Sequence, residues 1–309
     1  MRRAVWLLLA CSALLVSVAS ADSTSPLPGR LLFVKDGDLW LWDGTGPRLL
    51  ATSGATTQPS WSPDGASLAY VYRGTNFSDI FVTDTRGETQ TRLTTSQSAI
   101  LDDNDWNLRP AWSPDGTQIA FVSDRKTTYP TLWLMSAVDG SRLRPLSTPG
   151  VAGESIDALS WSPDGTRIAV SLFGSTGPSQ IAIVPVDPSR RELARVLTDR
   201  PGGALDPAWS PDGGWIVYAG RESYTSELFA NRPDGTGLQK LTSDGVLARS
   251  PAWSPDGQHL AYLTNKTGWF ELWVLDVLSD PSSSLVVGGS RQLTRDLHLD
   301  AVAGLAWGP

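Results

Sequence analysis

Short runs of β-branched and aromatic residues recur along most of the chain, and turns rich in Pro, Asp and Gly separate them. One set of runs reads SLAYVY, QIAFVSD, RIAVSL, WIVYAG and HLAYLTN, and each member is followed by a second run: DIFVTD, TLWLMS, IAIVPV, ELFANR or ELWVLD. Such runs are typical of β-strands. No segment longer than the first 21 residues has convincing helical periodicity, so the pattern predicts an all-β fold.

A tryptophan precedes each turn that opens these strand pairs. It recurs at spacings of 51, 49, 48, 44 and 54 residues, at Trp61, Trp112, Trp161, Trp209, Trp253 and Trp307. These spacings are typical of four-stranded propeller blades. Ser-Pro-Asp-Gly follows the first five and fits a type I hairpin turn, in which Pro fixes φ and Gly accepts the left-handed conformation. We therefore interpret the Asp as a turn residue and the Trp as packing between neighbouring blades.

The two ends of the chain predict the number of blades. LLFVKD, LWLWDG and PRLLAT precede the first repeat Trp and match the second, third and fourth strands of a unit, whereas GLAWGP at the other end matches a first strand. Together they complete a sixth blade and leave no open seam. The sequence thus predicts a six-bladed β-propeller of four-stranded antiparallel blades over residues 30–309, closed by three N-terminal strands and one C-terminal strand.

The first strand of each blade is expected to line the central channel. Proline stands two positions before the repeat Trp in four units, at Pro59, Pro110, Pro207 and Pro251, and a Ser or Ala stands directly before it in all six. Proline is tolerated at a sheet edge, where no ladder N–H is needed. Small residues fit the place where six sheets crowd toward one axis.

Residues 1–21 are predicted to be a signal peptide, followed by a linker over residues 22–29. Two arginines, an acid-free apolar run and Ala19-Ser20-Ala21 give the usual order of such a peptide. The protein is therefore expected to be exported, to the periplasm or the exterior. Two alternatives stay open: a lipid-anchored form cut at Cys11, and an uncleaved membrane anchor. Cys11 is the only cysteine, so the mature protein has no internal disulfide.

The repeat string P-x-W-S-P-D-G, with a strand after it, a later hairpin and a closing Leu-Thr, resembles the propeller repeat of the TolB family. More distantly, it resembles the propeller domain of the prolyl oligopeptidase family. The resemblance covers about residues 30–309. It implies a bacterial binding propeller that works in the periplasm with an outer-membrane lipoprotein. In the TolB family the propeller carries an additional amino-terminal α/β domain, whereas here about eight residues separate the expected cleavage site from the first strand. We therefore do not expect the full Tol-Pal role.

The resemblance to the peptidase family brings no catalytic site with it. The sequence has no Gly-x-Ser-x-Gly elbow, and its two histidines are distant from one another: His259 lies at a strand start beside a turn, and His298 lies in the last interblade connection. We therefore expect no enzymatic activity and no cofactor, and we interpret both histidines as surface residues. Two alternatives stay open: a metal-assisted propeller enzyme of the lyase or lactonase type, and an accessory propeller of a separate hydrolase.

Charged residues of both signs are predicted at one mouth of the channel, opposite the Ser-Pro-Asp-Gly turns. Arg73, Arg125, Arg221 and Lys266 follow second strands, and Arg109, Asp157, Asp206 and Arg249 precede the repeat Trp by three or four residues. Guanidinium groups grip carboxylates in pairs, so this mouth suits a protein or peptide partner from the cell envelope. The simpler interpretation is a set of solvated loop ends. The formal net charge of -7 argues against nucleic acid, and we expect a monomer.

The longest connection between repeats, residues 96–109, carries Asp102, Asp103 and Asp105 next to Trp106. Clustered oxygens can bind calcium, but this run lacks the glycine turn and distal glutamate of an EF-hand loop. We expect an ordinary acidic loop. A calcium site and a partner contact through an exposed Trp106 are the alternatives.

Overall fold

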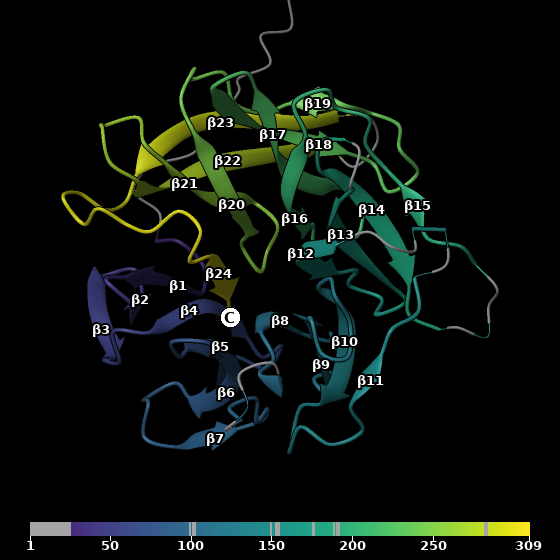
Figure 1. Ribbon diagram of the computed structural model, residues 1–309. Helices are drawn as coiled ribbons and strands as arrows, with labels where there is room; N and C mark the ends of the chain where they lie inside the picture. Colours follow the sequence, from purple (N-terminus) through teal and green to yellow (C-terminus); the bar gives the residue numbers. More distant parts are fainter. Residues whose placement is uncertain are drawn as a thin grey trace, which may run out of the picture.

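Six four-stranded antiparallel sheets surround one axis in the computed structural model (Figure 1). The structure describes residues 26–98, 100, 103–148, 150–151, 155–174, 177–187, 189, 192–280 and 284–309. The predicted all-β, six-bladed propeller is confirmed, and the described residues contain no α-helix. None of their elements is a helix suited to span a membrane. The predicted signal peptide, with Cys11, and the first residues of the linker lie outside the described residues.

In every blade the first strand is the one nearest the channel, and blades 1 to 3 contain the following strands in order from the channel outward. Blade 1 has β24 (Leu305–Gly308), β1 (Arg30–Lys35), β2 (Asp38–Trp42) and β3 (Pro47–Ala51). Blade 2 has β4 (Thr56–Trp61), β5 (Ser67–Arg73), β6 (Ser78–Asp84) and β7 (Gln90–Arg92). Blade 3 has β8 (Asn107–Trp112), β9 (Gln118–Ser123), β10 (Thr131–Ser136) and β11 (Arg144–Pro145).

Blades 4 to 6 follow the same order. Blade 4 has β12 (Ser155–Trp161), β13 (Arg167–Phe173), β14 (Gln180–Pro185) and β15 (Arg195–Val196). Blade 5 has β16 (Ala204–Trp209), β17 (Ile216–Glu222), β18 (Thr225–Asn231) and β19 (Gln239–Lys240). Blade 6 has β20 (Ala248–Trp253), β21 (His259–Thr264), β22 (Glu271–Asp280) and β23 (Ser284–Gln292).

The two ends of the chain close the ring as predicted. Strand β24 pairs antiparallel with β1, from Arg30 opposite Gly308 to Phe33 opposite Leu305. The C-terminus therefore lies near the centre of the ring (Figure 1). Because blade 1 is built from both ends, its hydrogen-bonded ladder holds the first and last segments of the propeller together.

The Ser-Pro-Asp-Gly turns have the predicted geometry. In the first of them the Ser62 hydroxyl donates to Asp64 Oδ1 at 2.6 Å, and Asp64 Oδ1 also accepts the N–H of Ala66 at 3.0 Å. Gly65 has φ of 66°, which a residue with a side chain adopts only under strain. These hydrogen bonds lower the pKa of Asp64, the bond from Ser62 most of all. The aspartate is thus a turn residue, as its position in the repeat predicts.

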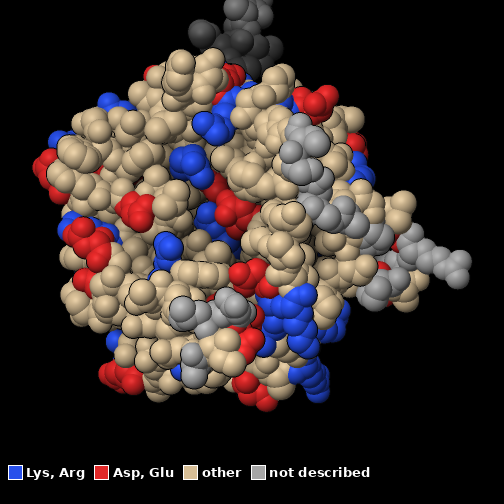
Figure 2. Space-filling model, viewed as in Figure 1, with Lys and Arg blue, Asp and Glu red and all other residues tan. Residues whose placement is uncertain are grey.

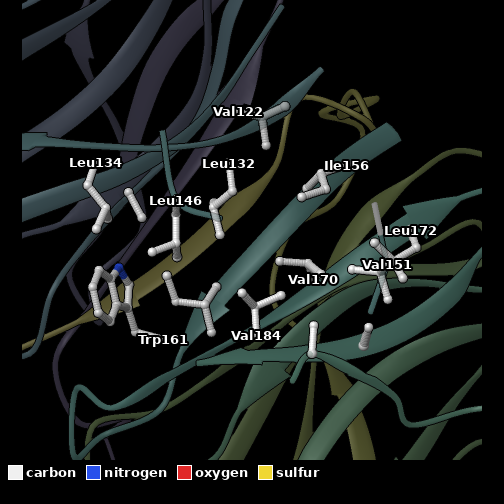
Figure 3. Close-up of a cluster of buried hydrophobic side chains, with 14 residues drawn as sticks. Val122, Leu132, Leu134, Leu146, Val151, Ile156, Trp161, Val170, Leu172 and Val184 are labelled. Carbon is white, nitrogen blue, oxygen red and sulfur yellow. The ribbon is translucent and has the colours of Figure 1, made fainter. Parts of the chain in front are cut away.

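Each repeat tryptophan packs against the preceding blade, which confirms its structural role. Trp161 lies against Leu134 and Leu146 of blade 3 in a buried cluster shared by blades 3 and 4 (Figure 3). Its indole N–H donates to the carbonyl of Ala111 at 3.1 Å. Burial of the large ring supplies apolar contact between sheets, and the hydrogen bond fixes its orientation.

Ring closure predicts a specific sensitivity at Gly308. A Cβ at this position would overlap the indole of Trp61, which leaves no room for even a methyl group. We expect Gly308→Ala to lower the free energy of unfolding by about 1–3 kcal/mol in urea denaturation, because overpacking forces side chains and backbone apart. Gly289→Ala is the matched control, since a Cβ there meets nothing within 4 Å. Equal stability of the two variants would contradict the tight closure.

Candidate functional site

The first strands line the channel with an irregular backbone. In blades 2 to 6 the pairing of the first strand with the second shifts register just before the repeat Trp, as between Thr57 and Ser60. Three positions before the Trp, φ is positive at Gln58, Arg109, Asp206 and Ser250. Left-handed residues other than glycine are uncommon, and bulges often redirect side chains beside functional sites. All four of these residues line the channel.

Four charged residues that precede the repeat Trp in blades 3 to 6 form one network. Arg249 Nε donates to Asp206 Oδ2 at 2.8 Å, and the N–H of Ser250 donates to the same oxygen at 3.2 Å. Arg109 Nη2 lies 3.7 Å from Asp157 Oδ2 and 3.9 Å from Asp206 Oδ1. The contacts therefore run from Asp157 to Arg109, on to Asp206 and then to Arg249, with one residue from each of blades 3 to 6. Basic and acidic side chains meet in the central depression of the face in view in Figure 2.

The network holds Asp206 and Arg249 in their charged forms although both side chains are largely buried. Burial alone raises the pKa of Asp206, but the guanidinium groups of Arg249 and Arg109 and the hydrogen bonds to its carboxylate hold that pKa below its ordinary value. Burial likewise opposes the charge on Arg249, yet Asp206 and Asp157 raise its pKa. The site thus presents fixed charges of both signs rather than neutral acids.

The channel has two cavities with different linings. One, of about 110 Å³, is lined by two of the charged residues, Arg109 and Asp206, and we call it the charged vestibule; Gln58, Ala158, Ser250 and Gly304 also line it. The other, of about 410 Å³, is lined by repeat tryptophans and by the small residues that precede them. Both share the six residues two positions before the Trp, which we call the apolar ring: Pro59, Pro110, Leu159, Pro207, Pro251 and Leu305. This ring lies between the two cavities.

The four basic residues predicted after second strands have different surroundings. Lys266 donates to Tyr262 and Ser290 and pairs with Asp244 at 2.6 Å, so its charge is compensated within blades 5 and 6. Arg125 pairs with Asp105 at 2.8 Å. Arg73 lies over the indole of Trp106, with its guanidinium carbon 5.8 Å from the ring centre. Arg221 is exposed.

The acidic residues and the tryptophan of residues 96–109 have different surroundings. Asp105 is paired with Arg125, and its pKa is raised because burial outweighs that charge. Asp103 is exposed, and Asp102 lies outside the described residues. Trp106 is half-buried beneath Arg73 and bridges to Ser78, so its indole is not the exposed anchor of the alternative interpretation. Within the described residues, no group of His, Cys, Asp and Glu is arranged to hold a metal ion.

An exposed ring of aromatic side chains was not predicted from the sequence. At or beside each second-to-third strand connection of blades 2 to 6 lies one exposed aromatic residue, and we call the set the aromatic rim: Tyr72, Tyr129, Phe173, Tyr224 and Trp269. Tyr224 is 97% exposed, and Trp269 stacks on His298 with ring centres 4.6 Å apart. Aligning the repeats at these connections would have revealed the set, because its members recur once per blade.

Buried acids that hold the interblade connections were also missed. Glu227 accepts the Thr242 hydroxyl at 2.5 Å and the N–H of Gly245 at 2.7 Å. Glu271 accepts the Thr294 hydroxyl at 2.5 Å and the N–H of Leu297 at 2.8 Å. The closing Leu-Thr of the repeat therefore ties a connection to a buried carboxylate, which satisfies both groups away from water. These ties position the segments that lead into the channel-lining strands.

The sequence matches one family across most of its length. Residues 44–155 and 151–293 match the PD40 family, described as the TolB beta propeller domain. A Bacillus subtilis protein named uncharacterized peptidase YuxL is 27% identical over 58% of this chain and 31% of its own length. A protein TolB homolog of Chlorobium luteolum is 30% identical over 53% of this chain and 34% of its own length. The chain thus spans about a third of the length of these two relatives.

Solved structures share the fold at low sequence identity. TolB from Acinetobacter baumannii superposes with a TM-score of 0.69 at 20% identity, covering 91% of this chain and 67% of that one. A putative TolB from Agrobacterium tumefaciens gives 0.64 at 16% identity, covering 92% and 99%. A prolyl endopeptidase structure gives 0.50 at 16% identity, covering 76% and 36%. These similarities concern the propeller itself.

The buried network predicts how stability depends on pH. The folded-state pKa of Asp206 lies below its ordinary value of 3.8, so the unfolded chain binds the proton first as the pH falls. The stability from this carboxylate is therefore fully present above about pH 4 and is lost as the pH falls through the folded-state pKa. We expect Asp206→Asn to cost about 3–5 kcal/mol at pH 7, because it leaves buried guanidinium groups unpaired.

Urea unfolding of both proteins across this range measures the effect. The difference in free energy of unfolding should narrow as the pH falls below about 4. A difference that stays constant down to the acid limit of the folded state would contradict the assigned role of Asp206.

Proposed function

We propose that this chain, which belongs to the TolB β-propeller family, is an exported propeller without catalytic activity that binds a protein or peptide partner at the mouth of its channel in the cell envelope. The aromatic rim is the observation that carries the proposal. Exposed aromatic and arginine side chains are the residue types most enriched at protein interfaces. In this molecule they surround an opening lined by fixed charges.

The rim and the charged vestibule make complementary contributions to such a surface. Tyr224 and Trp269 lie on neighbouring blades 5 and 6 and present large apolar areas to solvent. Arg221 stands on the same connection as Tyr224 and is exposed. Aromatic contact supplies most of the affinity in typical interfaces, and charges at the centre supply orientation and selectivity. A partner that covers the mouth would engage both.

A second candidate role rests on the similarity to peptidase-named proteins. The Bacillus subtilis relative and the prolyl endopeptidase structure match this chain over about a third of their own lengths. A propeller of this kind could assist a separately encoded hydrolase. Identification of the partner separates this role from the first, because an envelope protein without hydrolase activity would disfavour it.

Capture of a partner tests the proposed binding surface. The immobilised protein is incubated with an envelope extract of the native organism, and bound proteins are quantified by mass spectrometry. We expect Tyr224→Ser combined with Trp269→Ser to weaken capture roughly thirtyfold, as loss of a hot spot of about 2 kcal/mol does.

The matched control is Val138→Ser, which removes an exposed apolar side chain from the β10–β11 connection on the opposite face. This variant should capture as well as the unaltered protein. If both variants capture equally, the rim is not the binding surface.

Export has its own test at the amino terminus. Mass spectrometry of the protein isolated from native cells should find a chain that begins at Asp22 if the predicted signal peptide is removed. An acylated Cys11 at the amino terminus would instead identify a lipid-anchored form. An intact chain in the cytoplasmic fraction would contradict export.

A further inference from the structure

Among the described residues, the guanidinium group of Arg109 has no partner at hydrogen-bond distance. Its side chain is 15% exposed, and Nε is buried without an acceptor in the described part of the chain. The carboxylate oxygens of Asp157 and Asp206 lie 3.7 and 3.9 Å from Nη2, beyond the range of a good hydrogen bond. Buried donors of a charged group are rarely left unpaired in native proteins, because the loss of hydration is costly. The guanidinium group of Arg109 can therefore donate hydrogen bonds to an acceptor that enters the vestibule.

A complementary acceptor lies beside it. The side chain of Asp206 is 5% exposed, and its Oδ1 is buried with no hydrogen-bond partner among the described residues. Its other oxygen, Oδ2, is occupied by Arg249 and the N–H of Ser250. The vestibule therefore presents a free planar donor and a free acceptor next to one another, from blades 3 and 5.

We propose that the charged vestibule receives the carboxyl-terminal end of a peptide, with its terminal carboxylate on Arg109 and the last backbone N–H donated to Asp206 Oδ1. The inference deepens the proposed function and rests on it. At a chain end the carboxylate and the N–H are bonded to the same Cα, whereas the side chain of an internal aspartate holds its carboxylate one methylene group further from the N–H. A planar guanidinium binds such a carboxylate through two parallel hydrogen bonds.

The size of the vestibule agrees with a chain end. Its volume of about 110 Å³ equals that of three or four water molecules at about 30 Å³ each. A terminal residue fits this space, whereas a folded loop with two strands of backbone does not. The left-handed backbone at Arg109 and Asp206 places both side chains on the channel before a ligand arrives, which reduces the entropy lost on binding.

Asp157 sets the strength of this interaction. It is 39% exposed and stands 3.7 Å from Arg109 Nη2, so it repels an incoming carboxylate and competes for the guanidinium. Removing its charge should tighten binding of the peptide. A gain of affinity cannot arise from misfolding, which makes Asp157→Asn a decisive variant.

The test uses tripeptides on the full-length protein. Acetyl-tri-alanine, its carboxamide and acetyl-Ala-Asp-Ala-amide are titrated by calorimetry, and the side-chain Nε–H signals of ¹⁵N-labelled arginine are followed by NMR. We expect the affinity for acetyl-tri-alanine to be at least roughly tenfold higher than that for its carboxamide, because only the acid forms the charged pair. It should also bind more tightly than the peptide whose carboxylate lies on an aspartate side chain.

Three variants complete the experiment. Arg109→Gln should remove the preference for acid over carboxamide, and Asp157→Asn should raise the affinity for the acid several-fold. Arg142→Gln, an exposed arginine of the β10–β11 connection, is the matched control and should change neither. Equal binding of acid and carboxamide, no detectable binding of either, or a preference that survives Arg109→Gln would overturn the proposal.

The outcomes distinguish this inference from the proposed function. If the rim variant loses capture of the partner and the protein binds acetyl-tri-alanine and its carboxamide equally, the vestibule assignment is overturned and the proposed binding surface is retained. Selective binding of acetyl-tri-alanine without any rim-dependent partner would support the vestibule and contradict the wider binding surface. Tighter binding of the aspartate side-chain peptide would overturn the assignment to a chain end.

Discussion

The pairing of β24 with β1 is the interaction on which the other features of the molecule depend. It fixes the number of blades at six and draws six first strands to one axis. Crowding at that axis accounts for the Ser or Ala before each repeat Trp and for the prolines at strand edges that need no N–H partner. It also brings Gly304 and Leu305, from the end of the chain, into the same cavity as Gln58 and Arg109.

The same crowding creates the electrostatic character of the channel. Side chains from different blades meet there because the register shift in the first strands of blades 2 to 6 directs them inward. Two arginines and two aspartates form the network of the channel in a protein of net charge -7, so the network is balanced in charge but not in hydrogen bonding. The imbalance lies at Arg109 and Asp206 Oδ1, and it is a local property of the channel rather than a consequence of net charge.

The fold could be predicted because its signals are local. Each residue of Ser-Pro-Asp-Gly suits the backbone conformation of its position in the turn, so the turn can be predicted without distant residues. Arg109, Asp157, Asp206 and Arg249 could be selected as candidates because they stand three or four residues before the repeat Trp, and similar offsets in a repeat lie at similar distances from the axis. Their hydrogen bonding could not, because it depends on how far each blade is rotated against the next.

Residues whose roles depend on partners far along the chain were harder to interpret. Lys266 reads as a solvated loop end, yet Asp244, twenty-two residues earlier, pairs with it. An exposed Trp106 is only an alternative interpretation of an acidic loop, and its indole lies beneath Arg73 from the preceding blade. The buried carboxylates of Glu227 and Glu271 look like surface acids, because glutamate is rarely buried unless its partners are fixed by the fold.

The apolar ring separates the charged vestibule from the second, larger cavity of the channel. Its four prolines lack an N–H, and its two leucines add only hydrocarbon, so the side chains and amides of this level provide little that could replace water around a charged group. An ionised chain end that passed Arg109 would lose its solvation without compensation, and a threaded polypeptide is therefore disfavoured. The depth of entry is then limited to about one residue, and a partner would be recognised by its final position rather than by a longer sequence.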